Sequence, residues 1–99
     1  MRHARSIQGV PVRLTAERWE HICMAHGDMD GKEHDVLLTV QEPDRVLAGD
    51  RGEFLAVRLI AVQRWMVVVY RISGDDGFVI TAYRVSREGY FRQRRQLWP

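Results

Sequence analysis

The stretch from Arg64 to Ser86, RWMVVVYRISGDDGFVITAYRVS, decides the fold. It consists of two runs rich in Val, Ile and aromatic residues, joined by the segment GDDG at 74–77. Runs of this length around a Gly/Asp cluster predict a β-hairpin. Both sides of the first run are mostly apolar, so we expect the hairpin at the centre of a sheet. Thr81 and Tyr83 fall on one side of the second run, where we expect the floor of any chemical site.

The elements before the hairpin predict an α+β fold. Thr15 is a good N-cap for a helix that runs to about His26, and a second helix is expected over 32–41, ended by Pro43. Short strands are expected over 45–48 and 53–60, and a first strand over 7–14 would be confined to an edge by Pro11. We therefore predict a single domain, 1–99, with two N-terminal helices packed on a roughly four-stranded antiparallel sheet.

Composition indicates the class of protein and the cellular compartment. A chain of 99 residues with 45% hydrophobic content is long enough for one core. Cys23 is the single cysteine, and no apolar run approaches the roughly 18 residues of a membrane span. The N-terminus has no apolar signal core, so we expect a cytoplasmic protein without a membrane contact.

Arginine supplies 14 of the 15 basic residues, and five of them lie between residues 84 and 99. Planar guanidinium groups suit bidentate contacts with phosphate. The candidate phosphate ligands are Arg71 in the hairpin, Arg84 near its end, and Arg92, Arg94 and Arg95 in the tail. The alternative is that these arginines form an ordinary solvated surface.

The histidines do not predict a metal site. His21 and His26 are five residues apart, whereas two zinc ligands on one helix are usually four apart. Cys23 falls on the apolar side of the first helix, where packing is the simpler interpretation than nucleophilic catalysis. The GDDG segment lacks the lysine and following helix of a phosphate-binding loop. No metal and no cofactor are expected.

The remaining polar residues could cleave RNA without a metal. His21 and His26 could transfer protons near neutral pH, although the two need not point the same way. Arg58, which stands in line with apolar strand residues, could stabilise a crowded phosphate together with Thr81 and Tyr83. These five residues are the candidate catalytic set. The alternative for each helical histidine is a packing role.

Several short motifs resemble a family of small prokaryotic and phage-associated proteins. They are the helix W-x-H-I-x(3)-H at 19–26, the Glu42-Pro43-Asp44 turn, a strand that ends in arginine, and the V-I-T-A-Y strand at 79–83. That family is grouped with the barnase–EndoU–colicin–RelE-like (BECR) nucleases, and the match covers residues 13 to 87. The family often has arginine before the second histidine, where this chain has Ala25.

The resemblance implies two N-terminal helices on a four-stranded antiparallel sheet and a metal-independent endoribonuclease for structured RNA such as tRNA. It also implies a toxin or phage-encoded effector, with a neutralising antitoxin or immunity protein as a further partner. By motif position, it assigns His21 and His26 as the polar residues of the helix, Arg58 as the strand arginine, and Thr81 with Tyr83 as the hydroxyl pair.

A second function remains open. The same fold can serve as a non-catalytic module that binds RNA or a protein. In that case Trp19, Tyr83 and Trp98 are packing or stacking residues, and the histidines are incidental. Cleavage of tRNA in EDTA separates the two hypotheses.

Overall fold

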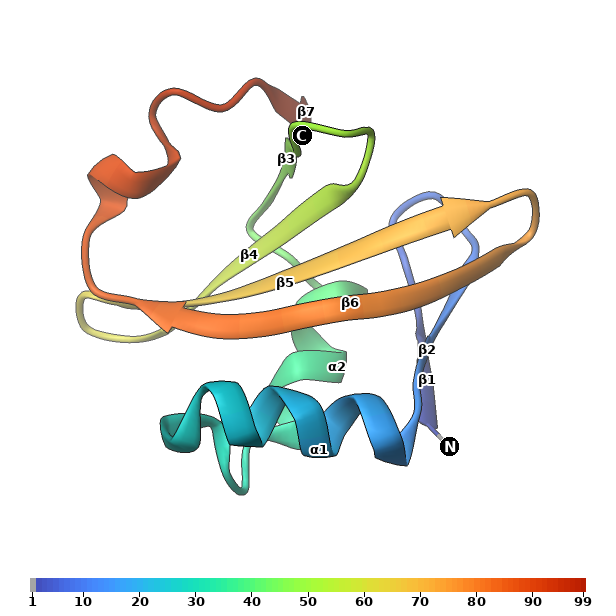
Figure 1. Ribbon diagram of the computed structural model, residues 1–99. Helices are drawn as coiled ribbons and strands as arrows, with labels where there is room; N and C mark the ends of the chain where they lie inside the picture. Colours follow the sequence, from blue (N-terminus) through green and yellow to red (C-terminus); the bar gives the residue numbers. More distant parts are fainter. Residues whose placement is uncertain (1) are drawn as a thin grey trace.

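The predicted hairpin is present at the centre of the molecule. In the computed structural model, which describes residues 2–99, it consists of the strands β5 (Arg64–Ser73) and β6 (Asp76–Val85) (Figure 1). Gly74 has a φ of +64° in the two-residue turn, a conformation that glycine adopts without strain. The remaining elements are, in chain order, β1 (Arg2–Arg5), β2 (Pro11–Leu14), α1 (Ala16–Ala25), the 3-10 helix η1 (Gly27–Met29), α2 (Glu33–Gln41), β3 (Arg45–Ala48), β4 (Phe54–Ala61), the 3-10 helix η2 (Glu88–Phe91) and β7 (Gln96–Trp98).

The prediction of two helices on roughly four antiparallel strands is wrong. The sheet has seven strands in the order β1-β2-β6-β5-β4-β3-β7. This order contains six pairs of adjacent strands, and one pair, β2 with β6, is parallel. The sheet is therefore mixed, although the β3-β4-β5-β6 centre is antiparallel as expected.

Two of the additional strands lie at the edges and have no alternating apolar pattern. β1 has the sequence RHAR, in which only Ala4 is buried, and all three residues of β7 are exposed. Their backbones pair with β2 and β3, respectively, so they add strands without adding much core. Period-two alternation, the main signal for a strand, is absent from both sequences.

The strand that contains Pro11 is not at an edge, contrary to the prediction. β2 lies between β1 and β6, but its ladder with β6 has only two residue pairs, Val12↔Gly77 and Arg13↔Phe78. Pro11, which has no N–H to donate, is not paired in this ladder. A Cβ atom on Gly77 would lie 2.9 Å from the Val12 side chain, so the close parallel approach requires glycine there.

The two helices cover one face of the sheet (Figure 1). The Thr15 side chain accepts a hydrogen bond from the Arg18 N–H at 3.1 Å, which confirms it as the N-cap of α1. Apolar side chains from the helices and η1 meet Met66, Val68 and Tyr70 of β5; they are Ile22, Met29, Val36, Leu37 and Val40. No helix within residues 2–99 has the length and apolar character needed to cross a membrane.

The C-terminal tail covers the other face. Phe91 of η2 is 2% exposed and packs with Leu47, Leu55, Val57 and Val67, so both faces of the hairpin are buried as the sequence predicts. The tail crosses this face as a strap and ends in β7 beside β3 (Figure 1). The molecule thus has a second core that the tail closes.

A bulge in β6 changes the direction of its side chains. Val69 pairs with Thr81 and the next residue, Tyr70, pairs with Val79, so Ile80 has no partner in β5. An extra residue of this kind shifts the alternation by one position. Val79 and Ala82 consequently both join the core under the helices, whereas the sequence alternation placed them on opposite sides. Tyr83 joins the core under the tail.

The buried Tyr70 phenol should make the free energy of unfolding depend on pH in the alkaline range. Its ring is fully buried, its hydroxyl donates to Gln8 Oε1 at 3.0 Å, and burial raises the pKa of the Tyr70 phenol. The unfolded chain therefore loses this proton at about pH 10, while the folded chain keeps it. We expect the free energy of unfolding to fall above that pH, by up to about 1.4 kcal/mol per pH unit for this group.

Urea denaturation of wild type and Tyr70→Phe between pH 8 and 11 tests this expectation. Phenylalanine fills the same space without an ionisable group, so the decline should be shallower in the variant. An equal decline in both proteins would contradict the assignment to Tyr70.

Candidate functional site

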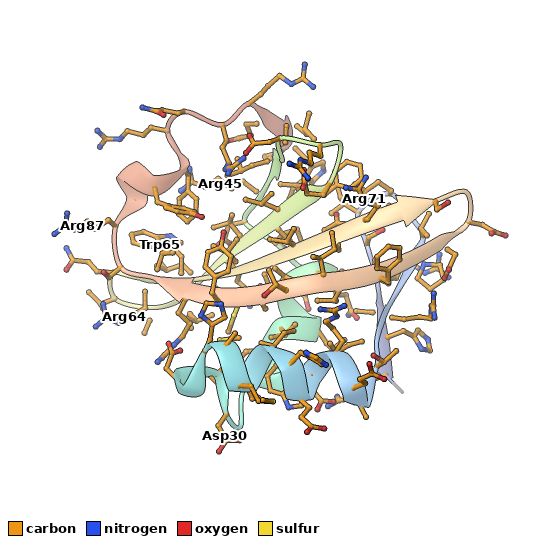
Figure 2. The ribbon with its side chains drawn as sticks, viewed as in Figure 1. Asp30, Arg45, Arg64, Trp65, Arg71 and Arg87 are labelled. Carbon is orange, nitrogen blue, oxygen red and sulfur yellow. The ribbon has the colours of Figure 1, made fainter. Side chains whose placement is uncertain are left out.

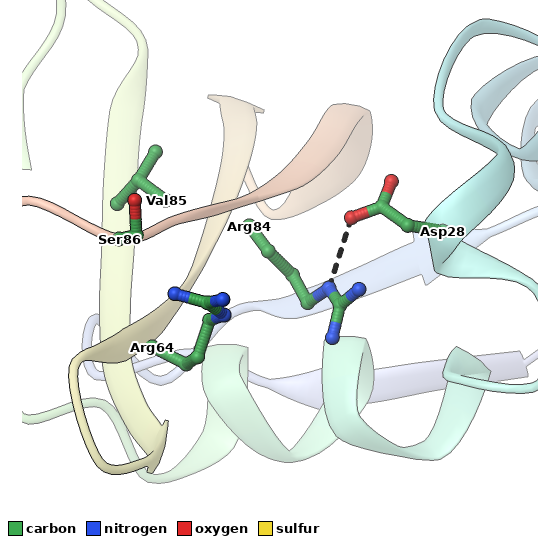
Figure 3. A pocket seen from close by; sticks show the side chains of 5 residues that line it. All are labelled: Asp28, Arg64, Arg84, Val85 and Ser86. Carbon is green, nitrogen blue, oxygen red and sulfur yellow. Dashed lines mark hydrogen bonds and ion pairs between the residues drawn. The ribbon is translucent and has the colours of Figure 1, made fainter.

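Two neighbouring pockets lie where β6 ends, close to several of the predicted catalytic residues. One pocket of about 240 Å³ is lined by Asp28, Arg64, Arg84, Val85 and Ser86 (Figure 3). A second, of about 420 Å³, shares Arg84, Val85 and Ser86 and adds Arg87 and Tyr90. Because the two share three residues, we treat them as one feature, the β6-end groove, defined by these seven residues.

The β6-end groove is positively charged. Arg84 Nε donates to Asp28 Oδ2 at 3.0 Å, which leaves the terminal nitrogens of this guanidinium free of that bond (Figure 3). Arg64 Nη1 donates to the backbone carbonyl of Gln63 at 3.2 Å, so its charge is not neutralised. Within residues 2–99 the Arg87 guanidinium has no partner. Three guanidinium groups therefore face one carboxylate, a balance that favours an anionic ligand.

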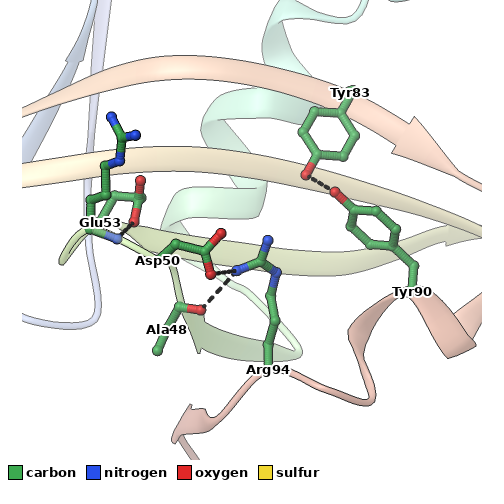
Figure 4. A network of polar contacts seen from close by, with 7 residues as sticks. Ala48, Asp50, Glu53, Tyr83, Tyr90 and Arg94 are labelled. Atoms are coloured by element: carbon green, nitrogen blue, oxygen red, sulfur yellow. Dashed lines mark hydrogen bonds and ion pairs between the residues drawn. The ribbon is translucent and has the colours of Figure 1, made fainter.

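A pair of tyrosines connects the groove to the sheet. The Tyr83 and Tyr90 hydroxyl oxygens are 2.6 Å apart, and either one can be the donor (Figure 4). The rings meet edge to face, with centroids 6.0 Å apart. Burial and the hydrogen bond to Tyr90 raise the pKa of Tyr83 well above its ordinary value. The Tyr83 hydroxyl therefore stays protonated at neutral pH and can donate a hydrogen bond, but the raised pKa makes it a weaker acid than an ordinary tyrosine.

His26 lies at the other side of Tyr83. It is the C-cap of α1, because its backbone N–H donates to the Ile22 carbonyl at the end of the helix. It also directly precedes η1 as the N-cap residue. The His26 and Tyr83 rings have centroids 5.9 Å apart. His26, Tyr83 and Tyr90 thus form a continuous series that ends in the wall of the groove, and Asp28 follows His26 by two residues.

Arg58 does not join this group. It lies in the same cross-strand row as Arg84, because both residues pair with Met66, but its Nη1 donates to the Glu42 carbonyl at 2.6 Å and it lines neither pocket of the groove. Glu42 is the C-cap of α2, where the negative end of the helix dipole attracts a cation. The sequence signal that singled out Arg58, a charge in line with apolar residues, is therefore explained by helix capping.

The remaining predicted residues are spread over several surfaces. His21 is exposed on α1, and Thr81 lies in β6 two residues before Tyr83. Arg71 Nη1 donates to the Arg51 carbonyl at 3.1 Å, and Arg94 Nη1 contacts Asp50 Oδ1 at 3.2 Å. Arg92 and Arg95 are exposed in the tail. Of the predicted set, the structure therefore places His26 beside Tyr83, and it places Arg84 beside Asp28 in the adjoining groove.

Sequence reasoning missed Arg64, Arg87 and Tyr90. A usable signal was present for Arg64, because a hairpin places the start of its first strand beside the end of its second. The pairing of Trp65 with Val85 does put Arg64 next to Ser86. The positions of Arg87 and Tyr90 depend on the path of the tail, which no local pattern specifies.

No family model, curated protein or solved structure matches the chain. Across residues 2–99, no three His, Cys, Asp or Glu side chains are grouped so that they could hold a metal ion.

Proposed function

We propose that the protein is a metal-independent endoribonuclease that binds structured RNA, such as tRNA, in the β6-end groove. The observation that carries the proposal is the set of three arginines next to the His26, Tyr83 and Tyr90 series. Arginines bind the phosphate backbone, an imidazole can transfer a proton near neutral pH, and an exposed tyrosine can stack on a base. The resemblance to the BECR nucleases points to the same reaction.

In the proposed reaction the 2′-hydroxyl of the substrate attacks the adjacent phosphorus. His26 accepts the 2′-hydroxyl proton as the O2′–P bond forms, and Arg64, Arg84 and Arg87 balance the negative charge on the phosphoryl oxygens. The P–O5′ bond breaks, and the hydroxyl of Tyr90, which lines the groove, supplies the proton to the departing O5′. The products are a 2′,3′-cyclic phosphate and a 5′-hydroxyl, and the enzyme is restored when the protonated His26 gives a proton to water and the tyrosinate takes one up.

The partners follow from the same chemistry. A neutralising antitoxin or immunity protein would need an acidic surface to cover the groove, because three of its lining side chains are arginines. Cys23 is a free thiol, which suits a reducing compartment such as the cytoplasm. We propose a toxin or phage-associated effector acting there.

Purified protein incubated with total tRNA in EDTA provides the test. We expect fragments with 2′,3′-cyclic phosphate ends from wild type, and cleavage at least about a hundredfold slower from His26→Ala. His34→Ala is the matched control, because His34 is an exposed histidine on α2. Absence of cleavage by wild type, or equal rates for wild type and His26→Ala, would overturn the proposal.

The second candidate is a non-catalytic RNA-binding module of the same fold. It is favoured by one observation: of the two predicted histidines, His26 reaches the tyrosine pair and His21 is exposed elsewhere on α1. A groove of arginines with Tyr90 as a stacking surface needs no imidazole to bind RNA. Binding of tRNA without cleavage, unchanged in His26→Ala, would support this function.

A further inference from the structure

Tyr90 separates two hollows. On one side it lines the β6-end groove, and on the other it lines a pocket of about 300 Å³ together with Asp50, Gln93 and Arg94. Asp50 follows β3, while the other three come from the tail, so the strap of chain over the sheet forms this pocket (Figure 4). The two hollows are therefore neighbours with a common aromatic wall.

The second pocket differs in chemistry from the first. It offers a carboxylate acceptor from Asp50, an amide with both donor and acceptor from Gln93, and guanidinium donors from Arg94. Arg94 Nη1 holds Asp50 Oδ1 at 3.2 Å and also contacts the Ala48 carbonyl at 3.4 Å, which orients the carboxylate (Figure 4). A carboxylate repels phosphate, so this mixture suits the edge of a nucleobase.

We infer that the pocket lined by Asp50, Tyr90, Gln93 and Arg94 is a nucleobase subsite that prefers guanine. This inference depends on the proposed RNA-binding function of the adjacent groove. Tyr90 is 46% exposed, so one side of its ring is available to stack on a base whose phosphate lies among the groove arginines.

The preference follows from the donors and acceptors of each base. Guanine presents two neighbouring donors, N1–H and the N2 amino group, to the two oxygens of the Asp50 carboxylate. Its O6 can accept from the Gln93 amide or the Arg94 guanidinium. Adenine places its N1 acceptor against the carboxylate and is disfavoured. Cytosine and uracil each offer only one donor group on this edge.

The test measures binding rather than cleavage. Fluorescein-labelled 2′-O-methyl pentanucleotides UUGUU, UUAUU, UUCUU and UUUUU, which lack the attacking hydroxyl and cannot be cleaved, are titrated and followed by anisotropy. We expect wild type to bind UUGUU about tenfold more tightly than UUAUU, which is a typical discrimination for one bidentate base contact. Asp50→Asn should lose this preference, because its amide presents a donor where guanine needs an acceptor.

Matched controls keep the result interpretable. Asp75→Asn removes the same charge at an exposed position in the β5–β6 turn and should retain the preference. Gln93→Ala, which leaves the Asp50–Arg94 ion pair intact, should reduce the preference if Asp50→Asn does not fold. Equal binding of the four oligonucleotides by wild type would overturn the guanine subsite and leave the groove proposal standing. Failure to bind any of them would overturn both.

Discussion

Replacement of Phe91 by alanine is expected to lower the free energy of unfolding by about 3–5 kcal/mol, the usual range for a large buried aromatic. Phe91 is 2% exposed and is the tail residue that fills the core over β3, β4 and β5. Its ring meets Trp65 edge to face, with centroids 6.2 Å apart, and the Arg45 guanidinium lies 5.3 Å from its centroid. Without this ring, the second face of the sheet opens to water.

Urea denaturation measures the loss, with Leu97→Ala as the control in the same tail. Leu97 is 42% exposed in β7, so its truncation should cost less than about 1 kcal/mol. Because Tyr90 precedes Phe91, we also expect the alanine variant to bind RNA more weakly under conditions in which it remains folded. A loss below about 1 kcal/mol for Phe91→Ala would contradict the role of the tail as a cover for the sheet.

The centre of the fold could be predicted from local sequence because its signals are local. A two-residue turn beginning at Gly74 joins the hairpin, and Thr15 caps α1 through its own side chain. The apolar character of both sides of β5 correctly indicated a sheet covered on two faces. The sequence did not show what covers the second face, because packing of the tail is a contact between distant parts of the chain.

The edges of the sheet could not be predicted for a different reason. β1 and β7 are held by backbone hydrogen bonds, and such bonds leave no pattern in the side chains. The parallel contact between β2 and β6 depends on the missing Cβ atom of Gly77, which sequence analysis cannot distinguish from an ordinary strand glycine. The bulge at Ile80 depends on strand register and altered the predicted faces of β6.

The candidate site, like the fold, could be predicted from the sequence only in part. His26, Tyr83 and Arg84 were identified from residue type, and the structure places them near one groove. Arg58 was identified by the same criterion and lies in the same cross-strand row as Arg84, but its guanidinium donates to the carbonyl at the end of α2 and lines neither pocket of the groove. Residue type indicates what a side chain can do, whereas the partner that it finds depends on how elements distant in the sequence pack together.

Simultaneous replacement of Arg64, Arg84 and Arg87 by glutamine is expected to weaken RNA binding about a hundredfold at 0.1 M salt. Each guanidinium that contacts a phosphate releases a counterion, which for a single strand contributes about fivefold at this salt concentration. Three lost contacts therefore multiply to about a hundredfold. They should also reduce the slope of log K against log salt by about 2. Anisotropy titrations of a labelled, uncleavable 2′-O-methyl RNA at salt concentrations from about 50 to about 300 mM measure both quantities.

The control must remove the same charge from another part of the surface. Arg2, Arg5 and Arg18 are exposed, and they lie on β1 and near the start of α1, away from the end of β6. Figure 2 shows Arg64 and Arg87 together at the end of the hairpin where β6 leads into the tail. If the groove binds the backbone, replacing the control arginines by glutamine should change affinity by no more than a few-fold. Equal losses for the two triple variants would mean that RNA responds to net charge alone, and the groove would then have no specific role in binding.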